Sequence, residues 1–118
     1  MRAEIRYFHS PDVEDLENWS PETPDCFSYL LQVFIGPKDG KGEESFDFIV
    51  CTPAWLKDHY SFDSVVPLRH YLLVFRHQFD AVRKTLEELV DRAQGDTWNE
   101  LAIWLASYGK WEFDGYSD

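Results

Sequence analysis

The sequence predicts an α+β fold, in which an antiparallel β-sheet of about four strands carries two C-terminal helices packed on one face. Apolar and polar residues alternate in the first half of the chain, which is typical of half-buried strands. After residue 78 the apolar residues recur at helical spacing. Strands that precede helices favour α+β over alternating α/β units. The 118 residues suit one compact domain, so we expect a single domain spanning residues 1–118.

Four segments have the composition of strands: residues 2–8, 26–35, 44–51 and 68–76. In the first segment Ala3, Ile5 and Tyr7 fall on one side. The second and third segments flank residues 36–42, a turn whose glycines permit positive φ angles. We therefore expect these two segments to form a β-hairpin.

Two helices are indicated after the hairpin. Thr52 suits an N-cap and Pro53 suits the first helical position, so a short helix is expected to begin there. A longer helix is expected after residue 78, with Asp80 at its acid-favouring N-terminal end and Gly95 closing it. Its buried stripe would consist of Phe79, Val82, Leu86, Leu89, Val90 and Ala93.

The last helix is expected to begin at a capping box over residues 97–100 and to run to about Tyr108, with Gly109 closing it. Its apolar residues are too widely spread around the helix for one buried face. Ile103 and Trp104 are therefore candidates for a contact outside the core. Residues 110–116 are expected either to add a short strand or to pack across the sheet.

The charge balance restricts the classes of partner. Eleven Lys and Arg residues face twenty-two Asp and Glu residues, and the net charge is -11. Such a surface repels phosphate groups, which argues against binding to nucleic acid or to an anionic membrane. A basic protein partner would instead be attracted. The same acidity is also found where it serves solubility alone, so this observation leaves both interpretations open.

The chain has no apolar run near the ~20 residues that a transmembrane helix needs. It also begins without the apolar core of a signal peptide, so we expect a cytoplasmic protein. In that compartment Cys26 and Cys51 are expected to be reduced, buried thiols in strands, without a disulfide. Two isolated cysteines cannot complete a structural zinc site, and we expect no metal and no cofactor.

The chain lacks the common catalytic motifs: no nucleophile elbow, phosphate-binding loop, dinucleotide fingerprint or zinc-protease helix is present. The nearest approach to a metal site, Asp58, His59 and Asp63, fits no standard ligand spacing. Cys51 has no cationic neighbour in sequence that would activate its thiol. We therefore expect a binding protein rather than an enzyme.

An ordered set of short fragments is spread over nearly the whole chain. The fragments are Asp15-Leu16-Glu17-Asn18-Trp19-Ser20-Pro21-Glu22 with Pro24, Asp25 and Phe27, Ile35-Gly36-Pro37, Gly42-Glu43-Glu44-Ser45-Phe46-Asp47, Val50-Cys51-Thr52-Pro53 with Trp55 and Leu56, Gly95-Asp96-Thr97-Trp98 and Trp111-Glu112-Phe113. Together they resemble the immunity protein 8 family of bacterial polymorphic toxin systems. The resemblance implies an α+β protein, encoded beside a toxin gene, that binds the cognate toxin domain and protects the producing cell. It carries over no catalytic or ligand-binding residue.

The acidic segment, which we define as residues 11–25, is the candidate contact with a toxin. It holds six carboxylates, three prolines and no basic residue. The alternative interpretation is a solvated acidic loop with no partner. A basic toxin domain, such as a nuclease, would suit the charge. The candidate contact residues are Asp12, Glu14, Asp15, Glu17 and Glu22, with Trp19 as a possible aromatic anchor.

Two other functions remain open at this point. A small-molecule-binding domain or minor enzyme would show a deep pocket lined by Trp and Tyr. An assembly subunit would show a large self-complementary apolar patch around Ile103 and Trp104. The sequence does not indicate the oligomeric state.

Overall fold

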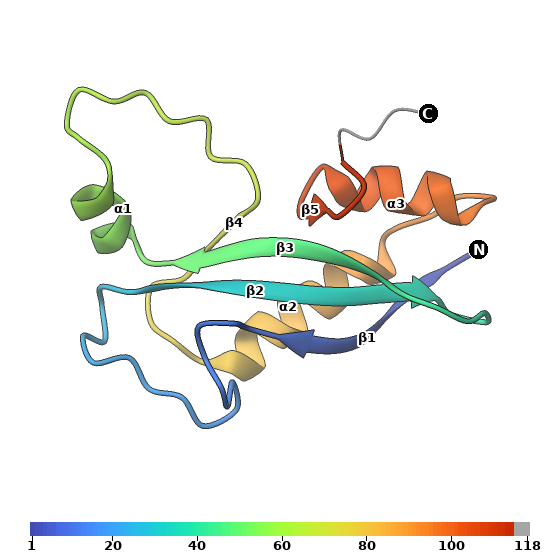
Figure 1. Cartoon of the computed structure of the whole chain (residues 1–118), viewed down its shortest axis with the longest axis horizontal. Coiled ribbons are helices and arrows are strands. Elements are labelled where there is room, and N and C mark those ends of the chain that lie inside the picture. The colour runs from blue at the N-terminus through green and yellow to red at the C-terminus, as the bar shows by residue number, and fades with distance from the viewer. Residues whose placement is uncertain (115–118) are drawn as a thin grey trace.

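A computed structural model describes residues 1–114, which form one mixed β-sheet and three helices (Figure 1). The prediction of an α+β fold is confirmed. No helix within these residues is long and apolar enough to cross a membrane. The elements are β1 Ala3–His9, β2 Ser28–Pro37, β3 Glu44–Cys51, α1 Pro53–His59, β4 Tyr71–Leu73, α2 Phe79–Asp91, α3 Trp98–Ala106 and β5 Lys110–Trp111.

The centre of the sheet is the antiparallel hairpin of β2 and β3, as the sequence predicts. Its register pairs Tyr29 with Val50, and Leu31 with Phe48. These four side chains are buried, because alternate residues of both strands point to the face that α2 covers. Figure 1 shows α2 crossing behind the sheet, so the opposite face of β1, β2 and β3 has no helix over it.

The edge strand β1 contains a register shift between Ile5 and Tyr7, opposite β2. The extra residue moves the following side chains to the other face of the sheet. Tyr7 therefore does not join Ala3 and Ile5 on one side, as strict alternation predicted. It lies on the open face, 48% exposed and stacked on Phe34 at 4.3 Å between ring centroids.

The outer edge of β3 is shared by two short strands. Near its C-terminal end β3 pairs in parallel with β4, through Ile49 and Tyr71. Near its N-terminal end it pairs antiparallel with β5, through Phe46 and Trp111. β4 runs parallel because α1 and residues 60–70 form a crossover connection, whereas the sequence suggested an antiparallel strand over residues 68–76. Of the two possibilities expected for residues 110–116, the structure has the short strand, β5. Gly115 and Tyr116 lie outside the described residues.

The N-termini of α1 and α3 are capped as predicted. Thr52 Oγ1 accepts a hydrogen bond from Trp55 N at 3.3 Å. Thr97 Oγ1 accepts one from Glu100 N at 3.2 Å. The Glu100 carboxylate reaches back to Asp96 N at 2.6 Å, one residue before the position that a capping box predicts.

Both C-terminal helices end earlier than the glycines suggested. α2 ends at Asp91, where Ala93 N bonds to Val90 O and tightens the final turn. α3 ends at Ala106, before Gly109. Gly109 is required for a different reason: a Cβ there would lie 2.6 Å from the ring of Phe48, because the chain crosses directly over the core.

Candidate functional site

The acidic segment is a loop that leaves β1 and returns to β2 at one end of the sheet, at the lower left of Figure 1. The segment contains a single turn over residues 15–18, closed by a hydrogen bond from Asn18 N to Asp15 O at 3.3 Å. Val13 is buried and holds the loop against the core. Most other side chains of the segment are exposed, so its carboxylates face solvent.

Three of the candidate carboxylates have structural partners. Asp12 Oδ2 accepts a hydrogen bond from Leu30 N at 2.8 Å and so ties the segment to β2. Asp15 accepts one from the Asn18 side chain at 2.8 Å. Glu17 forms an ion pair with Arg83 of α2. These contacts use part of the negative charge of the segment to hold it in place.

Glu14 and Glu22 differ from these three. Both are exposed, and neither carboxylate has a hydrogen-bond or ion-pair partner within residues 1–114. They are the two candidate carboxylates that remain free to meet a partner without breaking a contact of the fold.

Trp19 lies partly buried in an aromatic cluster that we define as Trp19, Phe27, Tyr29 and His77. Its ring centroid lies 5.6 Å from that of Phe27, 5.3 Å from Tyr29 and 4.9 Å from His77, all in edge-to-face contacts. Such geometry is favourable between aromatic rings. Trp19 therefore anchors the acidic segment to the core of its own chain.

The aromatic cluster leaves polar atoms unsatisfied. The Tyr29 hydroxyl and both ring nitrogens of His77 are closed off from solvent and have no hydrogen-bond partner among residues 1–114. Burial raises the pKa of Tyr29 and lowers the pKa of His77, because a charged form would be poorly solvated there. His77 is consequently held in its neutral form.

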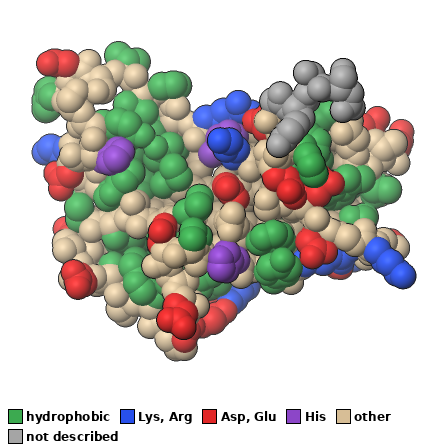
Figure 2. Space-filling view, viewed as in Figure 1, with side chains coloured by type: hydrophobic (Ala, Val, Ile, Leu, Met, Phe, Trp, Pro, Cys, Tyr) green, Lys and Arg blue, Asp and Glu red, His purple; other side chains and the backbone are tan. Residues whose placement is uncertain are grey.

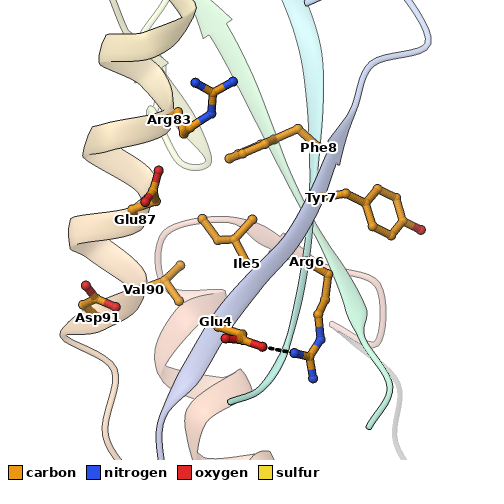
Figure 3. A pocket seen from close by; sticks show the side chains of 9 residues that line it. All are labelled: Glu4, Ile5, Arg6, Tyr7, Phe8, Arg83, Glu87, Val90 and Asp91. Carbon is orange, nitrogen blue, oxygen red and sulfur yellow. Dashed lines mark hydrogen bonds and ion pairs between the residues drawn. The ribbon is translucent and has the colours of Figure 1, made fainter. Parts of the chain in front are cut away.

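A cleft of about 390 Å³ separates β1 from α2 (Figure 3). Figure 3 shows Ile5, Phe8 and Val90 directed into the space between the two elements. Charged residues of both elements also line it: Glu4, Arg6, Arg83, Glu87 and Asp91. Its lining residues include Tyr7, whose ring points away from the space in Figure 3, and no Trp. This charged cleft is therefore not the Trp- and Tyr-lined pocket that a small-molecule-binding domain would require.

Sequence reasoning missed the segment between α1 and β4, which we call the apolar loop and define as residues 60–70. Phe62 is 97% exposed and Val65 is 96% exposed. The sequence did carry a signal for this exposed apolar segment. Its apolar residues stand among Ser, Asp and Pro and have neither the helical nor the strand spacing of buried residues. In Figure 2 hydrophobic side chains gather at the upper left, over α1 and this loop.

The acidic segment and α1 meet through Cys26. Its Sγ lies 3.5 Å from Asp58 Oδ2 of α1. Partial burial and this carboxylate raise the pKa of the Cys26 thiol. Cys26 precedes β2 and is only partly buried, so the expectation of a buried strand position was wrong for this residue. Cys51 is buried in β3, and both thiols are free.

Comparison with known proteins identifies the family of the chain. The model of the Immunity protein 8 family matches residues 3–116 of the 118 residues. The chain belongs to the Immunity protein 8 family. No curated protein matched it, and no solved structure matched it. Family membership makes the chain an immunity protein of a toxin system and implies that its partner is a toxin.

Three of the family-like fragments of this immunity protein converge at one atom. Glu44 Oε1 accepts hydrogen bonds from Trp98 Nε1 and from Trp111 Nε1, each at 2.8 Å. Beside it, Ser45 N donates to Glu112 Oε1 at 2.8 Å, and Glu112 N donates to Ser45 O at 3.0 Å. These fragments join β3, α3 and β5, which is a structural role.

Within residues 1–114, none of the four histidines of the immunity protein is hydrogen-bonded to a Ser, Thr or Cys side chain. His9 is exposed at the end of β1, and His59 stacks on Trp55. His70 Nδ1 lies 3.3 Å from Tyr108 O, and His77 lies in the aromatic cluster. The partner of the Cys26 thiol is a carboxylate, which raises the thiol's pKa and so does not activate it as a nucleophile. Within the described part of the chain, no group of three His, Cys, Asp or Glu residues is placed to hold a metal ion.

Proposed function

We propose that this immunity protein neutralises its cognate toxin domain by forming a stoichiometric complex with it in the cytoplasm, without any catalytic turnover of its own. The observation that carries the proposal is the family match over residues 3–116. The arrangement of the histidines and cysteines supports a binding role, because none of them is activated by a suitably placed partner.

We further propose that the toxin presents a basic surface, such as the substrate groove of a nuclease. The net charge of -11 supports this, since opposite charges accelerate association and help to orient the partners. The acidic segment is the proposed contact, with Asp12, Glu14, Asp15, Glu17, Trp19 and Glu22 as its candidate residues. Four of them hold the segment in place, namely Asp12, Asp15, Glu17 and Trp19. The carboxylates of the other two, Glu14 and Glu22, have no partner within residues 1–114.

Glu14 and Glu22 are the residues on which to test electrostatic steering. At about 10 Å in water a pair of unit charges interacts by ~0.4 kcal/mol, which is roughly a twofold change in rate per charge. The double variant Glu14→Gln/Glu22→Gln should therefore associate about fourfold more slowly at low ionic strength. At physiological salt, where the Debye length is about 8 Å, the difference should shrink.

The experiment is stopped-flow binding to the toxin domain encoded beside this gene, measured at two ionic strengths. A matched control is Lys84→Gln on the exposed side of α2, which removes a positive charge outside the segment and should not slow association. Asp12→Asn serves as a second control, because it weakens the bond to Leu30 N and should lower the free energy of unfolding. If Glu14→Gln/Glu22→Gln binds like the parent at both salts, the acidic segment is not the steering surface. If the parent neither binds the toxin domain nor protects cells, the proposed function is wrong.

A further inference from the structure

The apolar loop presents hydrophobic side chains that no other part of residues 1–114 covers. Phe62 and Val65 are almost fully exposed, and Leu68 is 53% exposed. Exposed apolar area is unfavourable in water, and this protein buries Leu31, Val33 and Phe46 completely elsewhere. The exposure of the loop therefore calls for a partner that covers it.

The first half of the apolar loop is held by side-chain and backbone hydrogen bonds. The Tyr60 and Tyr71 hydroxyls hydrogen-bond to each other, which fastens the start of the loop to β4. Ser64 N donates to Ser61 O at 3.0 Å, and the two Ser hydroxyls lie 2.7 Å apart. This turn carries Phe62 at its tip.

The second half is fastened to the rest of the fold. Arg69 Nη2 donates to Ala106 O of α3 at 3.2 Å. His70 adopts a positive φ of 69°, which is strained for a residue other than glycine, and its carbonyl accepts a hydrogen bond from Ile49 N at 2.8 Å. A loop held at both ends loses little conformational entropy when a partner binds its tip.

The surroundings of the loop combine an apolar hollow with charged side chains. A shallow hollow of about 300 Å³ lies beside it, lined by Leu56, Val66 and Leu68 and also by Lys57. Asp58 of α1 and Asp63 of the loop form no ion pair within residues 1–114. The net charge of -11 and the acidic segment at the same end of the sheet favour a partner whose apolar recess has basic side chains at its rim.

The apolar loop and the acidic segment lie at the same end of the sheet, the left end in Figure 1. The link between them is the contact of Cys26, the residue that follows the acidic segment, with Asp58 of α1. One partner can therefore face both. Trp19, the candidate aromatic anchor, packs against the core of its own chain. Phe62 is the exposed aromatic residue that can take this place.

We propose that the apolar loop is the anchor of the toxin complex, with Phe62 and Val65 inserted into an apolar recess of the toxin whose rim is basic. This inference rests on the proposed function. It assigns charge steering to the acidic segment and most of the binding energy to the loop tip, as in interfaces where a few buried apolar residues dominate affinity.

The test compares Phe62→Ser/Val65→Ser with Ile103→Ser, which removes a 57% exposed apolar side chain from α3. The probe is the toxin domain from the adjacent gene, carrying an inactivating substitution. The loop variant should bind ~30-fold or more weakly, mainly through faster dissociation, and should fail to protect cells. Ile103→Ser should bind like the parent. Asp58→Asn/Asp63→Asn should slow association at low salt only.

The outcomes separate the two proposals. If the parent binds and protects, but the loop variant keeps the parent's Kd, the anchor lies elsewhere and the proposed function stands. Weaker binding by Ile103→Ser alone would move the interface to α3 and also overturn the inference. Loss of the far-UV circular dichroism of the loop variant would show that these side chains support the fold, which their exposure argues against. A parent that does not bind the toxin domain refutes the proposed function itself.

Discussion

Replacing Glu44 should destabilise the fold more than its partly exposed position at the start of β3 suggests. One carboxylate oxygen accepts the indole N–H groups of Trp98 and Trp111, so it joins the start of α3 and the strand β5 to β3. Glu44→Leu removes the acceptor and leaves both half-buried indole N–H groups without it. Glu44→Gln keeps an oxygen acceptor but removes its charge.

The magnitude follows from the two bonds. A hydrogen bond to a charged group contributes about 1.5–3 kcal/mol, and a neutral one about 0.5–1.5 kcal/mol. The site is partly exposed, so the lower end of the charged range applies. Glu44→Leu should then lower the free energy of unfolding by about 3 kcal/mol, and Glu44→Gln by about 1 kcal/mol. The larger value is a substantial fraction of the roughly 5–15 kcal/mol typical of a small domain.

The assay is urea denaturation followed by tryptophan fluorescence, since both indoles at the site report on unfolding. The matched control is Glu43→Gln, at the exposed neighbouring position, which should stay within ~0.5 kcal/mol of the parent. The reasoning is refuted if Glu44→Leu is as stable as this control. It is also refuted if Glu44→Gln is as destabilised as Glu44→Leu, because the oxygen acceptor would then make no difference.

Two further predictions concern titratable groups. The pKa of His77 is lowered by burial, so the unfolded chain binds a proton more readily and stability should fall as the pH drops below ~6.5 towards the lowered pKa. His77→Phe should lose this decline, so its stability relative to the parent should rise between pH 7.5 and pH 5; a difference that does not vary with pH would contradict the argument. A thiol reagent should modify the partly exposed Cys26 of the native protein before the buried Cys51, with both reactions faster at alkaline pH because both pKa values are raised. Denatured protein without reductant should show two free thiols, and finding none would mean that the cysteines form a disulfide.

The parts of the fold that sequence reasoning recovered depend on local chemistry. The β2–β3 hairpin follows from strand composition around a turn in which Gly42 takes a φ of 88°. The N-caps at Thr52 and Thr97 follow from side chains that reach a backbone amide three residues along the chain. Such signals lie within a few residues of one another and can be read from a single chain.

What escaped prediction depends on contacts between distant segments. The register shift in β1 moved Tyr7 to the open face, and only the pairing with β2 reveals it. The short β4 has its direction set by the crossover before it. At the candidate site, composition located the acidic segment but not the partners of Asp12 and Glu17. Nor could it separate the partly buried Trp19 from the exposed Phe62, since both are large aromatic residues in loops.

The divided edge of β3 has a consequence during synthesis. The ribosome makes β3 before either of the strands that complete its edge, and β5 is separated from it by α2 and α3. Until those segments emerge, the unpaired backbone of β3 is a template for pairing with other strands, which makes the nascent chain prone to self-association. Translation that stops before Lys110 would leave half of this edge open permanently, and we expect such products to aggregate or to be degraded.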